Sequence, residues 1–546
     1  MTSTSALGTA RRTSCVNQST LTIVPPRHRL APNGFEPVLN NTMLENSPAI
    51  AITMSQQSNL RLPDMKRDST WLAGTDLFSV FLALVGQVIL TRSLLSSDYG
   101  LFIILLDLFA TTFLIVDLGL PTLLARDGVK APHLVWPAVW RVYGMQLKIA
   151  IPFFLLTLFL TPQIITSWQD EFSLLLLTSV IAIIHIASYA PRSALRAIGE
   201  ARIEGITKVI ERAITTTLYC ILLVKGYDNV EYFAAAFLAG ALIAWVFSLI
   251  QLSRLSKPLW LSEEIWNWKD LGESWISPKR LFFSAMPFAI TLGILPYVIR
   301  IEKFILAGHM GVDAAALFHV AQLAWLAGLV VPQAMRSALL PVLGNVRDDE
   351  TAFKSEIKKS MQFCFNLMPI GFYCGVIIVW LLLPIAFPSQ YIDGSLGASA
   401  VDIFFILLFG WAMTLLATPF YTALKAGKHP WRFTLFILLV VIFGSVVGWL
   451  LISYFSAIGA KQAIAAAAFA SSLTSLFLLV LSIHLSRSWP LVKEYIIGWI
   501  VLISSVAIAS YSLWNKDMIF AVSLPAIYFI CSLIYSKANP KNLESV

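Results

Sequence analysis

Stretches of about 20 apolar residues recur along this chain from Trp71 almost to the C-terminus, and a helix needs about that many to cross a hydrocarbon core about 30 Å thick. Hydrophobic residues make up 57% of the chain and charged residues only 13%, whereas soluble proteins have about 25% charged residues. Runs such as Leu101–Leu120 lack the period of two that a transmembrane β-barrel requires. The sequence therefore predicts an all-α polytopic membrane protein.

Polar breaks and Pro or Gly residues divide the apolar sequence into about fourteen expected transmembrane helices. Six precede a polar stretch between Arg254 and Arg280, and eight follow it. The expected spans are 71–91, 101–121, 136–160, 172–191, 206–224, 232–252, 282–299, 316–336, 363–387, 401–423, 431–455, 462–485, 492–513 and 518–535.

The distribution of basic residues supports this count and orients the chain. With both termini in the cytoplasm, most cations of the connecting segments, including Arg126, Arg192 and Arg196, lie on the cytoplasmic side. This bias follows the positive-inside rule, so the net charge of +8 requires no nucleic-acid partner. We expect a multi-pass protein of the cytoplasmic (inner) membrane. The cations expected on the other side are Arg92, Lys225, Arg300, Lys303, Lys461 and Lys516.

The two halves of the chain resemble each other at an offset of six spans. Residues 193–201 and 422–429 both read Ala-Leu-basic-Ala followed by Gly. The segments around 94–102 and 118–124 have similar counterparts near 310–318 and 335–343. An even number of spans per repeat relates the copies by a pseudo-two-fold axis along the membrane normal, which is typical of transporters. The expected architecture is two six-helix lobes followed by two C-terminal helices.

The corresponding domain boundaries follow from these spans. We expect a polar, disordered cytoplasmic tail over 1–70, an N-lobe over 71–252, a cytoplasmic interfacial linker over 253–281, a C-lobe over 282–485, and two additional helices with a short cytoplasmic tail over 486–546.

The first 70 residues have no apolar core of a secretory signal and no acidic residue before Glu36. Three interpretations stay open for this segment: a disordered cytoplasmic tail, a start codon placed too early with Met54 or Met65 as the true start, and an organellar transit peptide.

Several motifs resemble the polysaccharide-biosynthesis (O-antigen and oligosaccharide type) flippases of the MOP superfamily. They lie at Thr91–Phe102, Asp117–Pro121 and Leu195–Glu200 in the first half, and at Ala423–Lys428 and Ile458–Ala460 in the second. The resemblance covers roughly residues 70–490 and is diffuse. It implies export of a polyprenyl-diphosphate-linked glycan by alternating access, with membrane lipid and glycan polymerases or ligases as partners.

Charged side chains within a bilayer usually face a cavity or a partner because each costs about 2.5–3.5 kcal/mol on insertion scales. We interpret five cations as groups that receive an anionic diphosphate: Arg92, Lys148, Arg212, Arg300 and Lys303. Snorkelling of Arg212 to the cytoplasmic interface and anchoring of Arg92, Arg300 and Lys303 at the outer one are the structural alternatives.

Four acids are the expected counter-charges or coupling groups: Asp107, Asp117, Glu211 and Glu302. Asp107 and Asp117 lie close to three helical turns apart and are candidates for ion pairs with Lys148 or Arg126. His185 and His319 are either packing residues or groups that titrate during transport.

Motifs for ATP hydrolysis, zinc proteolysis and serine hydrolysis are missing, as is a CxxC pair, so we expect no enzyme, cofactor or metal site. A membrane glycosyltransferase would need a sizeable external catalytic loop, and the outer loops are short. Two transport alternatives stay open: a MATE-type antiporter of drugs or organic cations, and a flippase of peptidoglycan precursors.

Overall fold

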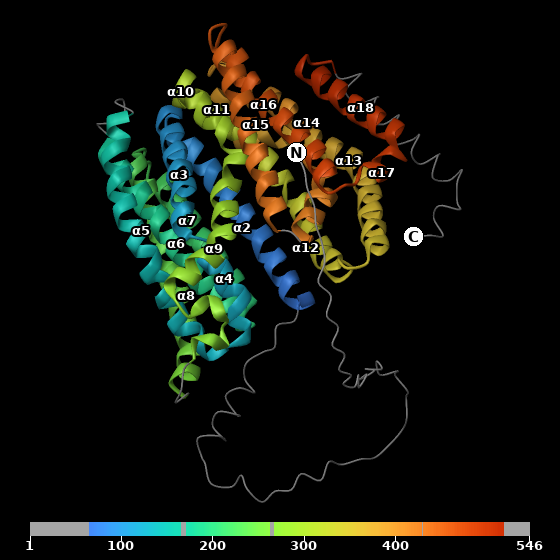
Figure 1. Ribbon diagram of the computed structural model, residues 1–546. Helices are drawn as coiled ribbons and strands as arrows, with labels where there is room; N and C mark the ends of the chain where they lie inside the picture. The colour runs from blue at the N-terminus through green and yellow to red at the C-terminus, as the bar shows by residue number, and fades with distance from the viewer. Residues whose placement is uncertain (1–64, 165–170, 263–266, 428–429, 518–546) are drawn as a thin grey trace, which may run out of the picture. The chain divides into compact units, whose positions relative to one another are not determined.

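The computed structural model describes residues 65–164, 171–262, 267–427 and 430–517, and these residues form helices and no strand (Figure 1). The expected tail over 1–64 and the fourteenth span at 518–535 lie outside the described residues. Each of the other thirteen expected spans coincides with helical structure. Eleven stretches of the described residues are long and apolar enough to cross a membrane. The prediction of an all-α polytopic membrane protein is thereby confirmed.

The helices of the first half carry the first six expected spans. The short helix α4 follows the second span, and the 3-10 turns η1 (Gly128–Lys130) and η2 (Pro132–Leu134) lead into the third. The helices are α2 (Met65–Ser93), α3 (Ser96–Asp117), α4 (Leu120–Asp127), α5 (Val135–Ile164), α6 (Phe172–Ala197), α7 (Ala201–Val224) and α8 (Val230–Ser262).

The second half contains two spans that are interrupted. The seventh span comprises α9, the 3-10 turn η6 (Leu295–Ile299) and α10, and the eighth comprises α11 and α12. The helices are α9 (Pro278–Ile294), α10 (Ile301–Met310), α11 (Val312–Gly328), α12 (Val330–Asn345), α13 (Glu350–Ala386), α14 (Ala400–Ala426), α15 (Pro430–Ser456), α16 (Ala460–Leu485), α17 (Trp489–Lys493) and α18 (Ile496–Trp514).

The same helix pairings occur in both halves, as the predicted repeat requires. In the first half, α2 packs on α7, α6 packs on α8, and α3 and α5 pack on α6. The second half repeats these pairings at an offset of six spans: α9 and α10 on α15, α14 on α16, and α11 and α13 on α14. Helices α6 and α14 both end directly after the shared Ala-Leu-basic-Ala motif, at Ala197 and Ala426.

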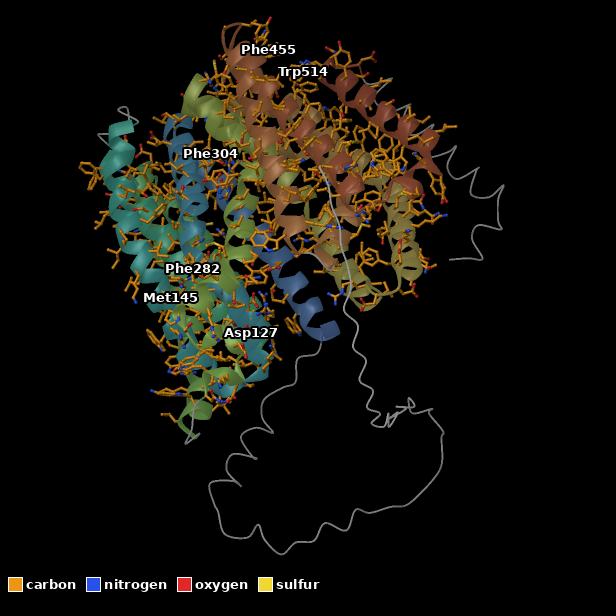
Figure 2. The ribbon with its side chains drawn as sticks, in the orientation of Figure 1. Asp127, Met145, Phe282, Phe304, Phe455 and Trp514 are labelled. Atoms are coloured by element: carbon orange, nitrogen blue, oxygen red, sulfur yellow. The ribbon has the colours of Figure 1, made fainter. Side chains whose placement is uncertain are left out.

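The linker between the halves is anchored to the first half by a buried tryptophan. Its 3-10 turns are η4 (Trp268–Asp270) and η5 (Glu273–Trp275). The indole of Trp275 is fully buried, and its Nε1–H donates to Asp127 Oδ2 at 3.1 Å. Burial of an aromatic ring with a satisfied N–H holds the linker against α4. Asp127 is labelled near the lower end of the helices in Figure 2.

The halves approach each other closely where α3 contacts α11. An alanine Cβ at Gly100 would lie 2.2 Å from the carbonyl oxygen of Val312, so only glycine fits between the two backbones. Nearby, Ser96 Oγ donates to Asp313 Oδ1 at 2.5 Å. The second span of each half therefore meets its counterpart directly, in agreement with the axis expected from the repeat (Figure 1).

Substitution of Gly100 tests this close approach. Gly100→Ala should lower the free energy of unfolding by about 1–3 kcal/mol, since the added methyl must push α3 away from α11. The matched control is Gly144→Ala in α5, where nothing lies within 4 Å of the added carbon. Thermal unfolding of both purified variants in detergent measures the difference. Equal melting temperatures would show that the two backbones are not in contact.

Candidate functional site

A break in the seventh span positions the cations of the candidate site. Pro296 lacks a backbone N–H, and the helix continues as the 3-10 turn η6 before α10 begins at Ile301. The carbonyl of Ile299 accepts a hydrogen bond from Gln322 Nε2 on α11 at 2.6 Å. A polar side chain thus satisfies a group that the interruption frees, as the membrane interior requires. Arg300 is the N-cap of α10, and Lys303 lies in its first turn.

Arg300 and Lys303 reach across to the first half and share the carboxylate of Asp107. Arg300 Nε lies 3.2 Å from Asp107 Oδ1, and the Arg300 guanidinium also donates to Thr111 Oγ1 at 2.6 Å. Lys303 Nζ pairs with Asp107 Oδ2. We call Asp107, Thr111, Arg300, Lys303 and His319 the interlobe cluster, because α3 contributes the first two and α10, its cap and α11 contribute the others.

The burial of the interlobe cluster differs from residue to residue. The side chain of Lys303 is 1% exposed, that of Asp107 17% and that of Arg300 24%. Lys303 Nζ also lies 3.0 Å from His319 Nδ1 on α11. Two cations face one carboxylate, so the cluster has an excess positive charge with the accessible guanidinium at its edge. Arginine is suited to bidentate binding of phosphate oxygens.

Glu302 lies apart from these cations although it adjoins Lys303 in sequence. It is fully buried, and both of its carboxyl oxygens lack a hydrogen-bond partner by strict geometry. Its side chain faces Gly448 of α15 and Thr474 of α16. A lone ionised carboxylate is costly at such a position. The predicted role of Glu302 as a counter-charge or coupling group therefore involves the second half alone.

The first half holds a second buried ion cluster around Glu211 of α7. Arg192 Nη2 of α6 lies 2.5 Å from Glu211 Oε2, and His185 Nε2 lies 3.1 Å from Oε1. Arg212 Nη2 is 3.9 Å from the same carboxylate, and its guanidinium lies over the ring of Phe237. The predicted counter-charge Glu211 thus has three basic neighbours. We call Arg192, His185, Glu211 and Arg212 the N-lobe cluster.

Tyr189 of α6 connects the two clusters electrostatically. Its hydroxyl interacts with Arg192 and Glu211 of the N-lobe cluster and with Arg300 of the interlobe cluster. The ring itself is 37% exposed. Tyr189 is therefore within electrostatic range of both clusters, and Arg212 and Arg300 are each partly exposed.

The other predicted site residues lie elsewhere. Arg92 donates to the carbonyls of Ile385 and Ala386 at 2.7 and 3.0 Å, at the C-terminal end of α13. Lys148 is exposed on α5. Asp117 is buried and accepts a hydrogen bond from Gln146 Nε2 at 3.1 Å. Arg92, Lys148 and Asp117 therefore belong to neither the interlobe cluster nor the N-lobe cluster.

Arg192 is not among the predicted site residues, because it was expected on the cytoplasmic side. Helix α6 continues to Ala197, so Arg192 lies more than a turn before the end of the helix and is 9% exposed. The spacing of seven residues from His185, two helical turns, is the signal that places both side chains on one face. Asp107 was expected to pair with Lys148 or Arg126, whereas its partners are Arg300 and Lys303. Within the described residues, no group of three or more His, Cys, Asp or Glu is arranged to hold a metal ion.

Comparison with curated proteins finds similarity over part of the chain. A Shigella flexneri protein with the description "Putative O-antigen transporter" is 25% identical over 248 residues, which cover 44% of this chain and 56% of that protein. The chain thus matches about half the length of this relative. No family model matches the sequence.

Comparison with solved structures identifies the fold. An inward-facing multidrug resistance MATE transporter of the MOP superfamily matches with a TM-score of 0.53 at 14% identity, over 82% of this chain and 99% of that one. A MOP superfamily transporter from Pyrococcus furiosus matches with a TM-score of 0.52 at 15% identity, over 81% and 97%. A MATE protein in a straight conformation also matches at 0.52 and 14% identity, over 79% and 96%.

Together, the fold of MOP superfamily transporters and the partial similarity to an O-antigen transporter confirm the predicted resemblance to O-antigen-type flippases. These named proteins are transporters rather than enzymes, as expected.

A double-mutant cycle tests the ion pair that joins the halves. Asp107→Asn should lower the free energy of unfolding by about 3–5 kcal/mol, since Lys303 is then buried without its carboxylate. Lys303→Met alone leaves Arg300 to neutralise Asp107 and should cost less. The double variant should be more stable than Asp107→Asn alone. Chemical unfolding in detergent measures all four proteins, and strictly additive effects would contradict the pairing.

Proposed function

We propose that this chain is a flippase that translocates a polyprenyl-diphosphate-linked oligosaccharide across the cytoplasmic membrane by alternating access. The observation that carries the proposal is the excess positive charge of the interlobe cluster, where Arg300 and Lys303 face one carboxylate. A diphosphate supplies the anionic oxygens that such a cluster lacks. The similarity to an O-antigen transporter supports the glycan part of the substrate.

The substrate headgroup would replace Asp107 as the partner of Arg300. The 24% exposure of the guanidinium makes it the accessible member of the cluster, while Lys303 is enclosed behind it. Exchange of a carboxylate for a phosphate keeps both cations paired. It also removes Arg300 from the bridge between the halves and leaves only the pair of Lys303 with Asp107, so that binding of substrate weakens the connection between α3 and α10.

The N-lobe cluster provides the opposite side of the proposed path. Arg212 is partly exposed, and Arg192 and His185 surround Glu211 beside it. The Tyr189 hydroxyl is within electrostatic range of Arg192, Glu211 and Arg300. A headgroup bound near Tyr189 would therefore meet cations from both halves. Arg92 and Lys148 remain proposed substrate contacts at the outer end of α2 and on the exposed face of α5.

Energy for transport would come from coupling to an ion or to the membrane potential. Glu302 is the proposed coupling carboxyl because it is fully buried and faces α15 and α16 rather than a cation. Protonation or pairing with a cation would remove its charge, and loss of that partner would favour a rearrangement of the second half.

Both termini would lie in the cytoplasm. The translocated glycan would enter surface polysaccharide or glycoconjugate assembly, with glycan polymerases or ligases as partners.

A peptidoglycan-precursor lipid has the same diphosphate and would meet the same cations. An antiporter of organic cations fits less well, since Asp107 is already neutralised by Arg300 and Lys303.

Transport by charge variants tests the proposed headgroup site. Arg300→Ala should reduce translocation of a polyprenyl-diphosphate glycan into proteoliposomes by at least about tenfold, since the phosphate loses a charge-assisted partner worth about 1.5–3 kcal/mol. Arg300→Lys retains the charge without the bidentate geometry, so its transport rate should lie between those of the unmodified chain and Arg300→Ala. Arg126→Ala is the control and should transport normally, since the Arg126 side chain is 56% exposed and belongs to neither cluster. Full activity of Arg300→Ala would contradict the assignment.

A further inference from the structure

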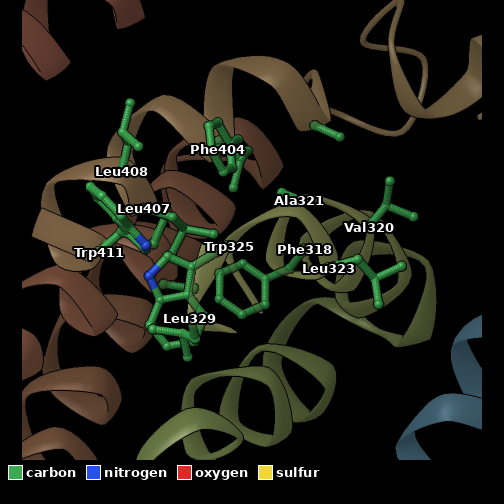
Figure 3. Close-up of a cluster of buried hydrophobic side chains, with 14 of the residues drawn as sticks. Phe318, Val320, Ala321, Leu323, Trp325, Leu329, Phe404, Leu407, Leu408 and Trp411 are labelled. Atoms are coloured by element: carbon green, nitrogen blue, oxygen red, sulfur yellow. The ribbon is translucent and has the colours of Figure 1, made fainter. Parts of the chain in front are cut away.

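An apolar cavity of about 430 Å³ lies between helices of both halves. Leu84 and Val88 of α2 line it from the first half, and residues of α11, α12, α13 and α14 line it from the second. All of its lining side chains are apolar, aromatic, glycine or cysteine. Figure 3 shows part of this lining, where Trp325 of α11 lies close to Trp411 of α14, and Leu323 lies farther along α11.

Glycines and one tryptophan give the cavity its shape. Gly371 of α13 lies against the indole ring of Trp411, and Gly328 lies against its pyrrole edge, so that an added Cβ would lie 2.2 Å and 2.9 Å from the ring. The indole N–H donates to the carbonyl of Gly328 at 2.9 Å. This carbonyl lies where α11 ends and the eighth span is interrupted. Trp411 is therefore held in place and forms a wall of the cavity.

The cavity opens toward the surface of α13, a helix with a membrane-crossing stretch. Its lining residues Ile378 and Leu382 are 52% and 55% exposed, and the neighbouring Ile377, Leu381 and Ile385 are also exposed. In a bilayer such a surface faces lipid hydrocarbon. An aliphatic chain matches this entrance best, because the indole N–H of Trp325 and the thiol of Cys374 are the only side-chain groups of the lining that could partner a polar group.

The position of the cavity connects it to the interlobe cluster. Leu323 follows His319 on α11 by four residues, which is one helical turn and about 6 Å along the axis. Because α2 belongs to the first half and α11 to the second, movement of the halves would change the cavity. A resident bilayer lipid requires neither closeness to the interlobe cluster nor a lining from both halves. The chain of a transported lipid whose headgroup binds at Arg300 accounts for both features.

We propose that this cavity binds the polyprenyl chain of the transported lipid while its diphosphate occupies the interlobe cluster. The inference rests on the proposed function, and it adds a separate hydrophobic subsite. It assigns α11 to both parts of the ligand: His319 near the headgroup, and Leu323 to Gly328 beside the chain.

Photocrosslinking with a polyprenyl monophosphate that carries a diazirine in the isoprene units nearest the phosphate tests the subsite. The probe is added to the full chain in phospholipid nanodiscs, and labelled peptides are identified by mass spectrometry. Labels should concentrate on 323–331 and 371–387, which line the cavity. Ile378→Trp should lower this labelling by about tenfold, the ratio that about 1.4 kcal/mol of lost binding produces.

The matched control is Ile377→Trp, which adds the same ring at an adjacent, equally exposed position that does not line the cavity. Its labelling should match that of the unmodified chain. Cys374→Phe, also in the lining and exposed, gives a second filled cavity if Ile378→Trp does not fold. Uniform labelling of lipid-facing helices, or equal labelling in the filled and control variants, would overturn the proposal.

A phosphatidylglycerol probe with the diazirine in its acyl chain separates the two sources of hydrocarbon. Labelling of the same peptides with equal yield, and no competition by the polyprenyl probe, would identify a resident lipid and overturn the proposal. Labelling and flippase activity are measured separately, so failure of the subsite can be distinguished from failure of the proposed function. An unlabelled cavity in a chain that still flips lipid-linked glycan rejects only the subsite, whereas a labelled cavity in a chain without flippase activity rejects the proposed function and leaves a polyprenyl-binding cavity without a role in transport.

Discussion

The carboxylate of Asp107 pairs with two cations of the opposite half, and the arrangement of the halves depends on it. Lys303 is almost completely buried, and an ammonium group removed from water costs several kcal/mol unless a partner compensates it. That partner lies on α3, while Lys303 lies on α10. The close packing of Gly100 against Val312 brings these helices within reach. Separation of the halves therefore requires another anion to take the place of Asp107, and the proposed substrate carries one.

Interruptions of the spans explain how the second half presents these groups. Pro296 ends the regular helix before Arg300, and Gln322 satisfies the carbonyl of Ile299. The eighth span is interrupted after Gly328, whose carbonyl is bound by Trp411. The first break positions the cations, and the second forms a wall of the apolar cavity. A charged site and a hydrophobic site thus lie one helical turn apart on α11, as an amphipathic lipid requires.

The sequence predicted the membrane class, the repeat and about fourteen spans, of which the thirteen within the described residues coincide with helices. These features are predictable because apolar length and the distribution of cations depend on local composition. It also identified Arg300, Lys303 and Asp107 as charges within the membrane, but it did not pair them. Ion pairs between α3 and α10 join residues nearly 200 positions apart, and periodicity contains no information on such contacts. Arg192 was missed because the expected fourth span ended at residue 191, whereas α6 continues to Ala197.

The central claim is that the chain moves a lipid-linked glycan. The most direct measurement deletes the gene in its native organism, extracts polyprenyl-diphosphate lipids, and analyses their sugars by mass spectrometry beside the surface glycans. The account predicts that lipid-linked oligosaccharide accumulates while the surface glycan is lost, and that the wild-type chain restores both. Unchanged lipids and glycans together with altered sensitivity to organic cations would contradict the account and favour an antiporter.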